Sequence, residues 1–291
     1  MIFIVIPVFN RKNFTRACIL SLQCQQWKAF KIILVDHGST DGTADMIVAE
    51  FPSVILLKGN ESMWWTAATN LGVKKALEIS KSDTDFVLTL NNDLEVNPEY
   101  LDELLNVYET NKSCIVGSTS IDINDKNKIS FIGVFWNKYT AKYKQNGLAQ
   151  MPYSMLVKNI LFVQSDLLPG RGTLIPIYLF KKIGLFDEIN FPHYAGDEDF
   201  SLRAKNEGLK LLVSTKAIVK SHINETGINV RNSTSFKKFL ISFTSIRSAN
   251  NFKHRYKWAK RHAEFTFLYF VIDVLRLFGS YFRTLTKSHM K

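Results

Sequence analysis

The sequence IFIVIPVFNR, residues 2–11, decides the fold class. Seven mostly β-branched, apolar residues precede the polar residues Asn10 and Arg11, a pattern typical of a strand buried on both faces of a parallel sheet. Runs of the same kind recur at residues 31–36 (KIILVD), 54–58 (VILLK) and 86–90 (FVLTL). Helices are predicted between them, at residues 14–25, from residue 43 onwards and at residues 67–79. This alternation predicts an α/β fold with a mostly parallel central sheet flanked by helices, in which ligands bind beyond the carboxyl ends of the strands.

The second half of the sequence has shorter apolar runs separated by glycine and asparagine. The pattern predicts strands at residues 113–119, 129–135, 170–176 and 210–222, and helices at residues 177–183 and 199–207. The stretch from residue 136 to residue 154 is expected to be loop-rich.

Length and composition describe an ordinary globular protein. The chain has 291 residues, of which 46% are hydrophobic and 22% charged, so disorder is excluded as its main state. The three cysteines, Cys18, Cys24 and Cys114, have no C-x-x-C spacing. Unpaired thiols favour a reducing, cytoplasmic setting.

The net charge of +11 is confined to the C-terminal part of the chain. Residues 229–291 contain 13 Lys and Arg against 2 Asp and Glu, whereas residues 1–228 contain 24 of each kind. We therefore divide the chain into a neutral domain, residues 1–228, and a basic helical extension, residues 229–291. The first residues lack the basic flank and cleavage site of a signal peptide, and no apolar run is long enough to span a membrane.

The extension contains a predicted amphipathic helix at residues 265–282. One expected polar stripe is formed by Asp273, Arg276, Ser280 and Arg283, and the remaining face by Phe265, Leu268, Ile272, Leu275, Phe278 and Phe282. Such a helix, flanked by Lys and Arg, is typical of a contact with a membrane surface, and packing on a second subunit of a homodimer is an equal alternative. Nucleic acid is not expected as a partner, because no nucleic-acid-binding module is present. A peripheral location at the inner face of the cell membrane follows from the first alternative.

Polar residues follow several of the predicted strands. Asp36 ends the second predicted strand, just before the turn HGSTDGT. It could accept hydrogen bonds from a ribose or a base, since the capping of the next helix suits Asp41 better. Asn91 and Asp93, in LNNDL, place oxygen atoms at alternate positions that could face a divalent cation, or could form a simple Asx turn. His222, at the end of the last strand, could be a further metal ligand or a structural residue.

Three consecutive acids, Asp197, Glu198 and Asp199, begin a predicted helix. Acidic side chains in the first turn of a helix interact favourably with the helix dipole, which would explain one or two of these acids. A third carboxylate, partly free in a cleft, would suit a general base.

Six segments in the same order resemble family 2 glycosyltransferases of the GT-A fold: IPVFNR, LVDHGSTDGT, TLNNDLEV, LPGRGTLIP, GLFDE and AGDEDFSLRAKNEG. The resemblance covers roughly residues 1–225. The motif LNND, in place of Asp-x-Asp, is similar to the rhamnosyltransferase-like branch that builds bacterial surface polysaccharides.

The resemblance implies roles for individual residues. Asp93 and His222 would bind Mg²⁺ or Mn²⁺, although Asn91 stands where the first Asp of the motif is usual and removes one charge. The nucleotide would be lined by Pro7, Phe9, Asn10, Arg11, Asp36, Ser39, Asn91 and Asn92.

The catalytic base implied by the resemblance is Asp197, with Asp199 in reserve; Gly196 replaces the usual Glu. Trp64 and Trp65 could stack on a base or sugar ring, or could simply pack in the core. The donor or acceptor sugar and the phosphates would meet Trp65, Asn70, Gly170, Arg171, Gly172 and Glu198.

The function that follows is an inverting hexosyltransferase of surface polysaccharide synthesis. It would move a sugar from a UDP- or dTDP-linked donor to a saccharide acceptor, plausibly lipid-linked. The alternative is a catalytically inactive protein of the same fold that binds sugar nucleotides or polysaccharide. A Rossmann-type dinucleotide enzyme is excluded because IPVFNRKNF contains no glycine.

Overall fold

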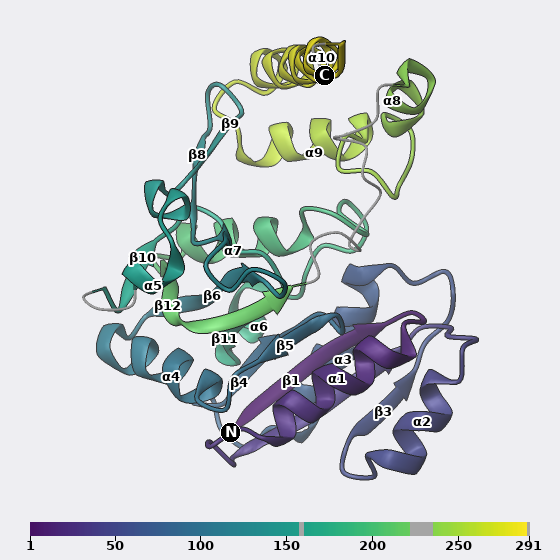
Figure 1. Ribbon diagram of the computed structural model, residues 1–291, viewed down its shortest axis with the longest axis vertical. Helices are drawn as coiled ribbons and strands as arrows, with labels where there is room; N and C mark the ends of the chain where they lie inside the picture. The colour runs from purple at the N-terminus through teal and green to yellow at the C-terminus, as the bar shows by residue number, and fades with distance from the viewer. Residues whose placement is uncertain (157–159, 222–234, 290–291) are drawn as a thin grey trace.

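A computed structural model describes residues 1–156, 160–221 and 235–289. Within these residues a ten-stranded sheet has the order β10-β12-β6-β11-β4-β1-β2-β3, with β5 paired to β12 and β7 paired to β6 (Figure 1). The strands of this sheet are β1 (Ile2–Val8), β2 (Phe30–Asp36), β3 (Ile55–Lys58), β4 (Phe86–Thr89), β5 (Leu94–Val96), β6 (Cys114–Asp122), β7 (Ile129–Phe131), β10 (Phe162–Gln164), β11 (Thr173–Pro176) and β12 (Lys210–Ser221).

Helices cover both faces of the sheet, and three further helices, α8, α9 and α10, lie at the C-terminal end of the chain. The helices are α1 (Lys12–Gln23), α2 (Thr43–Glu50), α3 (Trp65–Ile79), α4 (Tyr100–Asn111), α5 (Tyr153–Leu156), α6 (Tyr178–Ile183), α7 (Gly196–Asn206), α8 (Phe236–Ser242), α9 (Phe252–His262) and α10 (Thr266–His289). A short 3₁₀ helix spans Gly147–Gln150, and a separate hairpin is formed by β8 (Val134–Asn137) and β9 (Lys142–Gln145).

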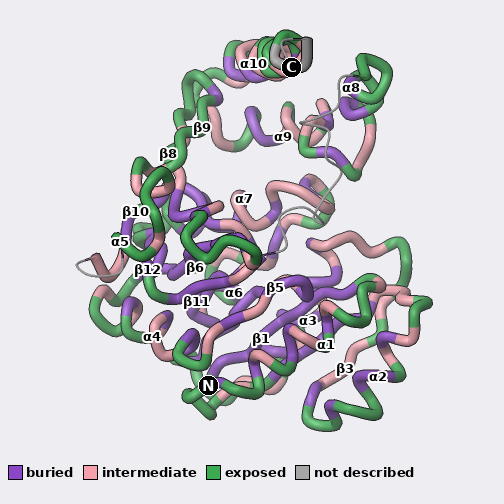
Figure 2. The backbone as a smooth tube through the Cα atoms, in the orientation of Figure 1, coloured by how far each residue is buried: buried purple, intermediate pink, exposed green. Residues whose placement is uncertain are grey.

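The parallel half of the sheet confirms the predicted fold class. Strands β3, β2, β1 and β4 run parallel, and every residue of β1 is buried. Because successive side chains of a strand point to opposite faces, Ile4 and Ile6 pack with α1, α2 and α4, while Phe3 and Val5 pack with α3, α6 and α7. Figure 2 shows the result as a continuous buried layer along the central strands.

Strand β11 runs antiparallel to β4, with Thr173 opposite Thr89. The beginning of β11 therefore lies at the same edge of the sheet as the carboxyl end of β4. This direction was not predicted from sequence, and it brings the loop that precedes β11 to the edge where ligands bind in a parallel sheet.

Two predicted elements differ from the structure. The expected strand at residues 129–135 is divided into β7 and β8 at Gly133, whose φ is +94°. Part of the expected loop at residues 136–154 instead forms strand β9, which pairs with β8 and makes a hairpin that reaches toward the C-terminal helices (Figure 1).

The extension packs on the rest of the protein through α9. Trp258 of α9 and Tyr269 of α10 belong to one buried cluster with Phe191 and Leu202, and Trp136 of β8 donates from Nε1 to the Tyr269 hydroxyl at 2.9 Å. Helices α8, α9 and α10 lie together at one end of the molecule (Figure 1). Helices α8, α9 and α10 of the extension are therefore part of the folded structure.

Helix α10 is amphipathic, but its faces differ from the prediction. Asp273, expected in an exposed polar stripe, is buried and forms an ion pair with Arg255 of α9 at 2.5 Å. The outward face carries Leu268, Leu275 and Phe282, which are 54%, 64% and 56% exposed. Among the described helices, none is long and apolar enough to cross a membrane.

Candidate active site

Five segments meet at the edge of the sheet formed by the carboxyl ends of the parallel strands. They follow β1 and β2, follow β4, precede β11, and begin α7. Most of the residues predicted to form a site belong to these segments.

The segments after β1 and β2 are joined by hydrogen bonds. Asp36 is buried, and its Oδ1 accepts from the backbone N–H of Gly38 at 3.1 Å and of Ser39 at 2.8 Å. The Ser39 hydroxyl accepts from the backbone N–H of Asn10 at 2.8 Å. The structure thus places these three predicted nucleotide-binding residues together, with one oxygen of Asp36 holding its own loop.

Pro7 and Phe9 differ in their surroundings. Pro7 is buried within β1, opposite Val35 of β2. Phe9 is exposed and stacks on the His37 ring, with 5.3 Å between the ring centroids. Phe9 therefore offers an aromatic surface to a ligand, whereas Pro7 supports the strand.

Asp93, which follows β4, is buried and forms an ion pair with Arg11. Arg11 Nη1 lies 2.8 Å from Asp93 Oδ2. Arg11 has a φ of 65° and Asn10 a φ of 59°, a left-handed conformation that is uncommon outside glycine and often marks a functional loop.

The two asparagines before Asp93 have different surroundings. The side-chain oxygen of Asn91 accepts from Trp65 Nε1 at 3.0 Å, so it lies at the rim. Asn92 is buried, and its Nδ2 donates to the hydroxyl of Thr15 in α1 at 2.9 Å. Asn92 points away from the rim, so its geometry suits support of the loop rather than the predicted contact with a nucleotide.

The predicted Mg²⁺ or Mn²⁺ site is only partly supported by these residues. Asp93 is held by Arg11, the oxygen of Asn91 is already an acceptor, and His222 lies outside the described residues. Within the described part of the chain, no group of three His, Cys, Asp or Glu side chains could hold a metal ion. Among the residues that the structure describes, Asp93 is thus the one charged candidate ligand of this predicted site, and a cation would compete with Arg11 for it.

The loop before β11 contacts the first turn of α7 and the beginning of α3. The backbone N–H of Gly170 donates to Asp197 Oδ2 at 2.5 Å. A Cβ atom at Gly170 would overlap the Trp65 ring and lie 3.2 Å from the Cβ of Asp197. Residue 170 must therefore be glycine for Trp65 and Asp197 to approach this loop together. Trp65 donates a hydrogen bond to Asn91, and Asp197 is the predicted base.

Gly170→Ala should therefore displace Trp65 and disturb both sides of the rim. Overpacking of this kind lowers the free energy of unfolding by about 1–3 kcal/mol, and the displacement of Trp65 should weaken the binding of a ligand at the rim. Calorimetric titration with UDP measures the change. Gly147→Ala is the matched control, because a Cβ there meets nothing within 4 Å, and equal affinities of the two variants would contradict the prediction.

Arg171 follows Gly170 in this loop, and its charge interacts with two carboxylates of the site. Burial lowers the pKa of its guanidinium, and the charges of Asp93 and Asp197 both act in the opposite direction. The next residue, Gly172, has a φ of +87°, and a Cβ there would lie 2.7 Å from the hydroxyl groups of Ser118 and Tyr100. The conformation that positions Arg171 therefore requires glycine.

Asp197 and Glu198 form an acidic pair at the start of α7. Burial raises the pKa of Asp197, while the N–H groups of Gly170 and Glu198 and the charge of Arg171 oppose the rise. Burial and the neighbouring Asp197 raise the pKa of Glu198 to about 8. A carboxylate whose pKa is raised toward neutrality is suited to accept a proton.

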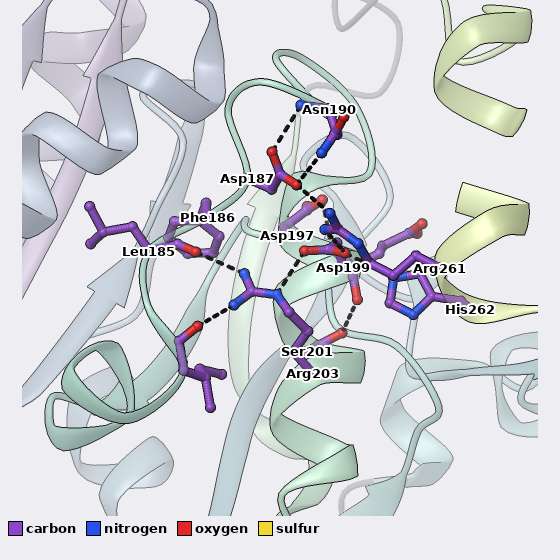
Figure 3. Close-up of polar contacts among 12 residues, drawn as sticks. Leu185, Phe186, Asp187, Asn190, Asp197, Asp199, Ser201, Arg203, Arg261 and His262 are labelled. Atoms are coloured by element: carbon purple, nitrogen blue, oxygen red, sulfur yellow. Dashed lines mark hydrogen bonds and ion pairs between the residues drawn. The ribbon is translucent and has the colours of Figure 1, made fainter. Parts of the chain in front are cut away.

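Asp199, the reserve candidate, has quite different surroundings (Figure 3). It is fully buried: its Oδ2 pairs with Arg203 at 2.9 Å, and its Oδ1 with Arg261 at 2.8 Å and His262 at 2.9 Å. Burial alone would raise the pKa of Asp199, but these hydrogen bonds and charges hold it below its ordinary value. With both oxygens engaged, Asp199 suits the anchoring of α7 to α9 rather than proton transfer.

The same anchor includes residues that sequence analysis missed. Arg261 also pairs with Asp187 at 2.6 Å, and Arg203 donates to the backbone oxygens of Ile183 and Leu185 (Figure 3). The spacing of Asp199 and Arg203, four positions apart on one helix, was a signal of their pairing. No local pattern pointed to Arg261 or His262.

Asn70 also supports a neighbouring loop and does not face the rim. It is buried, and its amide group exchanges hydrogen bonds with the backbone of Phe186 at 2.9 and 3.1 Å. Its Nδ2 also donates to Glu188 at 2.6 Å. The predicted contact of Asn70 with a sugar or phosphate does not match this position.

Comparison with known proteins gives a family match and distant relatives. The sequence model described as Glycosyl transferase family 2 matches residues 3–159, more than half of the chain. An uncharacterised glycosyltransferase of Rickettsia typhi is 28% identical over 190 residues, which are 65% of this chain and 54% of that protein. The chain thus spans about half the length of the Rickettsia typhi and Rickettsia prowazekii relatives it matches. An N-acetylglucosaminyl-diphospho-decaprenol L-rhamnosyltransferase of Mycobacterium tuberculosis is 24% identical over 234 residues, 71% of each chain.

Two solved structures share the fold. The crystal structure of GalNAc-T7 with UDP, GalNAc and Mn²⁺ has a TM-score of 0.59 at 15% identity, covering 76% of this chain and 43% of that one. Staphylococcus aureus TarS with UDP has a TM-score of 0.51 at 16% identity, covering 75% and 59%. The predicted GT-A fold, with helices at its C-terminal end, is confirmed.

Proposed function

The chain belongs to glycosyl transferase family 2, and from this premise we propose that it transfers a hexosyl group from a nucleotide-diphosphate sugar to a hydroxyl group of a saccharide. The proposed reaction is a single displacement that inverts the anomeric carbon. The observation that carries it is the hydrogen bond of 2.5 Å from the Gly170 N–H to Asp197 Oδ2, which joins the proposed base to the loop that contains Arg171.

Asp197 is the proposed general base. The attacking hydroxyl must lose its proton as it bonds to the anomeric carbon, and a carboxylate with a raised pKa can accept that proton. The Gly170 N–H, 2.5 Å from Asp197 Oδ2, fixes the orientation of the carboxylate.

The diphosphate leaving group is proposed to meet Arg11 and Arg171. Negative charge develops on the leaving oxygen, and guanidinium groups at the rim would stabilise it. Phe9, Asn10, Asp36 and Ser39 are retained as the proposed nucleotide-binding residues, together with the oxygen of Asn91. The Mg²⁺ or Mn²⁺ prediction is retained in a narrower form: Asp93 and His222 would be ligands, and the cation would neutralise diphosphate charge when bound.

Calorimetric titration of the full-length protein with UDP, dTDP and GDP, with and without Mn²⁺, tests the donor site. We propose UDP or dTDP, because relatives of the same fold were solved with UDP. Release of free sugar from the corresponding donor then separates a transferase from an inactive sugar-nucleotide-binding protein. Binding without any hydrolysis or transfer would support the inactive alternative, and no binding of any nucleotide would overturn the proposal.

The acceptor is proposed to be a saccharide linked to a lipid and presented at the inner face of the cell membrane. Support comes from the mycobacterial relative, whose name includes a decaprenol-linked saccharide, and from the extension, residues 229–291. Leu268, Leu275 and Phe282 form an exposed apolar face on α10, and Arg276 and Arg283 lie beside it in the helical sequence. An apolar face bordered by arginines suits an anionic membrane surface.

Leu275→Glu combined with Phe282→Glu should release the protein from vesicles of anionic phospholipid. Each side chain contributes about 1.5–3 kcal/mol when buried in an apolar environment, so partitioning in a flotation assay should fall more than about tenfold. Val48→Glu is the control, because Val48 is also an exposed apolar residue but lies on α2, in the N-terminal part of the chain. Unchanged flotation, together with a loss of dimer in light scattering, would support the homodimer alternative instead.

A further inference from the structure

Trp64, beside the candidate active site, contacts both the transferase domain and the extension. Its ring lies 5.3 Å from the His193 ring and 5.5 Å from the Arg247 guanidinium, measured to the ring centroid. Two residues later, Thr66 donates from its backbone N–H to the backbone oxygen of Pro192 at 3.1 Å. Its hydroxyl group donates to the backbone oxygen of Phe191 at 2.6 Å. The beginning of α3, the loop before α7 and the connection between α8 and α9 therefore meet at Trp64.

The connection that carries Arg247 is held in place by its own hydrogen bonds. Asn251 Nδ2 donates to the backbone oxygen of Thr244 at 3.0 Å, and Arg255 Nε donates to that of Ala249 at 2.9 Å. Asn251 is buried, whereas Arg247 is exposed. A guanidinium that lies on an aromatic face keeps its N–H edges available for a ligand.

His193, which contacts the same Trp64 ring as Arg247, has a ring nitrogen without a hydrogen-bond partner among the described residues. The Nδ1 atoms of His193, His254 and His37 are buried and form no hydrogen bond. Buried polar atoms are usually paired, so the unpaired ring nitrogen of His193, beside Trp64, is a candidate for ligand contact.

The positive charge at this position comes from Arg247, because the lowered pKa values of His193 and His254 leave their imidazole rings neutral near pH 7. Burial, Arg247, His37 and His254 together lower the pKa of His193 to about 4. Burial, Lys257 and Lys253 lower the pKa of His254. Among the described residues, no carboxylate acts on His193, so an anion is the ligand that would complement this charge.

We propose that Arg247 and His193, arranged around Trp64, form a subsite for an anionic group of the acceptor, either a phosphate or a diphosphate. The proposal rests on the proposed function and adds the chemistry of the acceptor. His193 lies four residues before Asp197, so an acceptor held there would be near the proposed base. Trp65 contacts Asn91 and the Gly170 loop, which belong to the proposed donor site. We therefore assign Trp65 to the donor and Trp64 to the acceptor.

The subsite also connects the two parts of the protein. Arg247 belongs to the extension, between α8 and α9, and the exposed apolar side chains of α8 and α10 belong to the same unit (Figure 1). A lipid diphosphate whose chain lies in a membrane would present its charge beside such a unit. The same groups would also bind a phosphorylated saccharide in solution.

The test uses the full-length protein saturated with UDP, so that the donor site is occupied. Inorganic pyrophosphate and geranyl diphosphate are the two probes, and calorimetry gives their affinities. Both should bind, and Arg247→Gln should weaken them at least about tenfold, the effect of losing one charge-assisted hydrogen bond. Lys237→Gln is the control, since it removes an equal charge from exposed helix α8.

A histidine NMR titration provides the second measurement. Bound anion should raise the pKa of His193, and the rise should be absent from Arg247→Gln. Tighter binding of geranyl diphosphate than of pyrophosphate would indicate that the acceptor is linked to a lipid. Equal binding of the two probes would indicate that the subsite recognises the phosphate groups alone. Either result supports the subsite. Competition of both probes with UDP, or equal affinity of wild type and Arg247→Gln, would overturn it. UDP affinity is measured separately, so failure of the donor site is distinguishable from failure of this subsite.

Discussion

Asp197→Asn is expected to lower the rate of sugar transfer by about 10²–10⁴-fold, the contribution typical of a general base. An asparagine oxygen can still accept the Gly170 N–H, which lies 2.5 Å from Asp197 Oδ2, so the loop should keep its position. UDP affinity should therefore be unchanged. Rates under saturating donor and nucleotide titrations of both proteins measure the two effects.

The pH dependence of the rate gives an independent check. Burial raises the pKa of Asp197, so the carboxylate that accepts the proton is lost at a higher pH than an ordinary aspartate would lose it. The wild-type rate should fall as pH decreases through that pKa, and the residual rate of Asp197→Asn should lack this limb. Asp45→Asn is the control, because Asp45 is an exposed acid in the first turn of α2. A fully active Asp197→Asn protein would rule out this base.

Asp199→Ala is expected to reduce the free energy of unfolding by about 3–5 kcal/mol. Asp199 is fully buried and balances the charges of Arg203 and Arg261, which lose their partner when the carboxylate is removed. Chemical denaturation measures the loss. Asp45→Ala, which removes an exposed acid from the first turn of another helix, should have a small effect.

The stabilisation by Asp199 should depend on pH in a defined direction. Its pKa is lowered in the folded protein, so its contribution is complete above the ordinary aspartate pKa of 3.8 and is lost as pH falls through the folded value. The difference between wild type and Asp199→Ala should therefore be constant near neutral pH and decrease in strong acid. A difference below about 1 kcal/mol at neutral pH, the range of surface ion pairs, would contradict a buried anchor.

Sequence patterns predicted the parallel half of the fold because that information is local. Each strand and the polar residue near its end lie within a few positions of one another in the sequence: Asn10 comes shortly after β1, and Asp36 is the last residue of β2. The direction of β11 could not be predicted in the same way, since it depends on pairing with β4, about 80 residues earlier. That pairing brings Gly170 and Arg171 to the rim.

Individual site residues were harder to assign than their segments. Asn92 and Asn70 were expected at a ligand because their motifs are polar, but both donate to neighbouring elements of the same protein. Asp199 was expected as an alternative base because three acids are adjacent. Successive positions of a helix point in different directions, and only the fold shows that Asp199 points toward α9.

The contact of Arg261 and His262 with Asp199 has a consequence for inheritance. A recombination event that replaced the C-terminal helices of this protein by those of a relative would leave the carboxylate of Asp199 without two of its three side-chain partners. Such a hybrid would survive selection only if a compensating substitution arose at residue 199. The two halves of the gene are therefore expected to descend together.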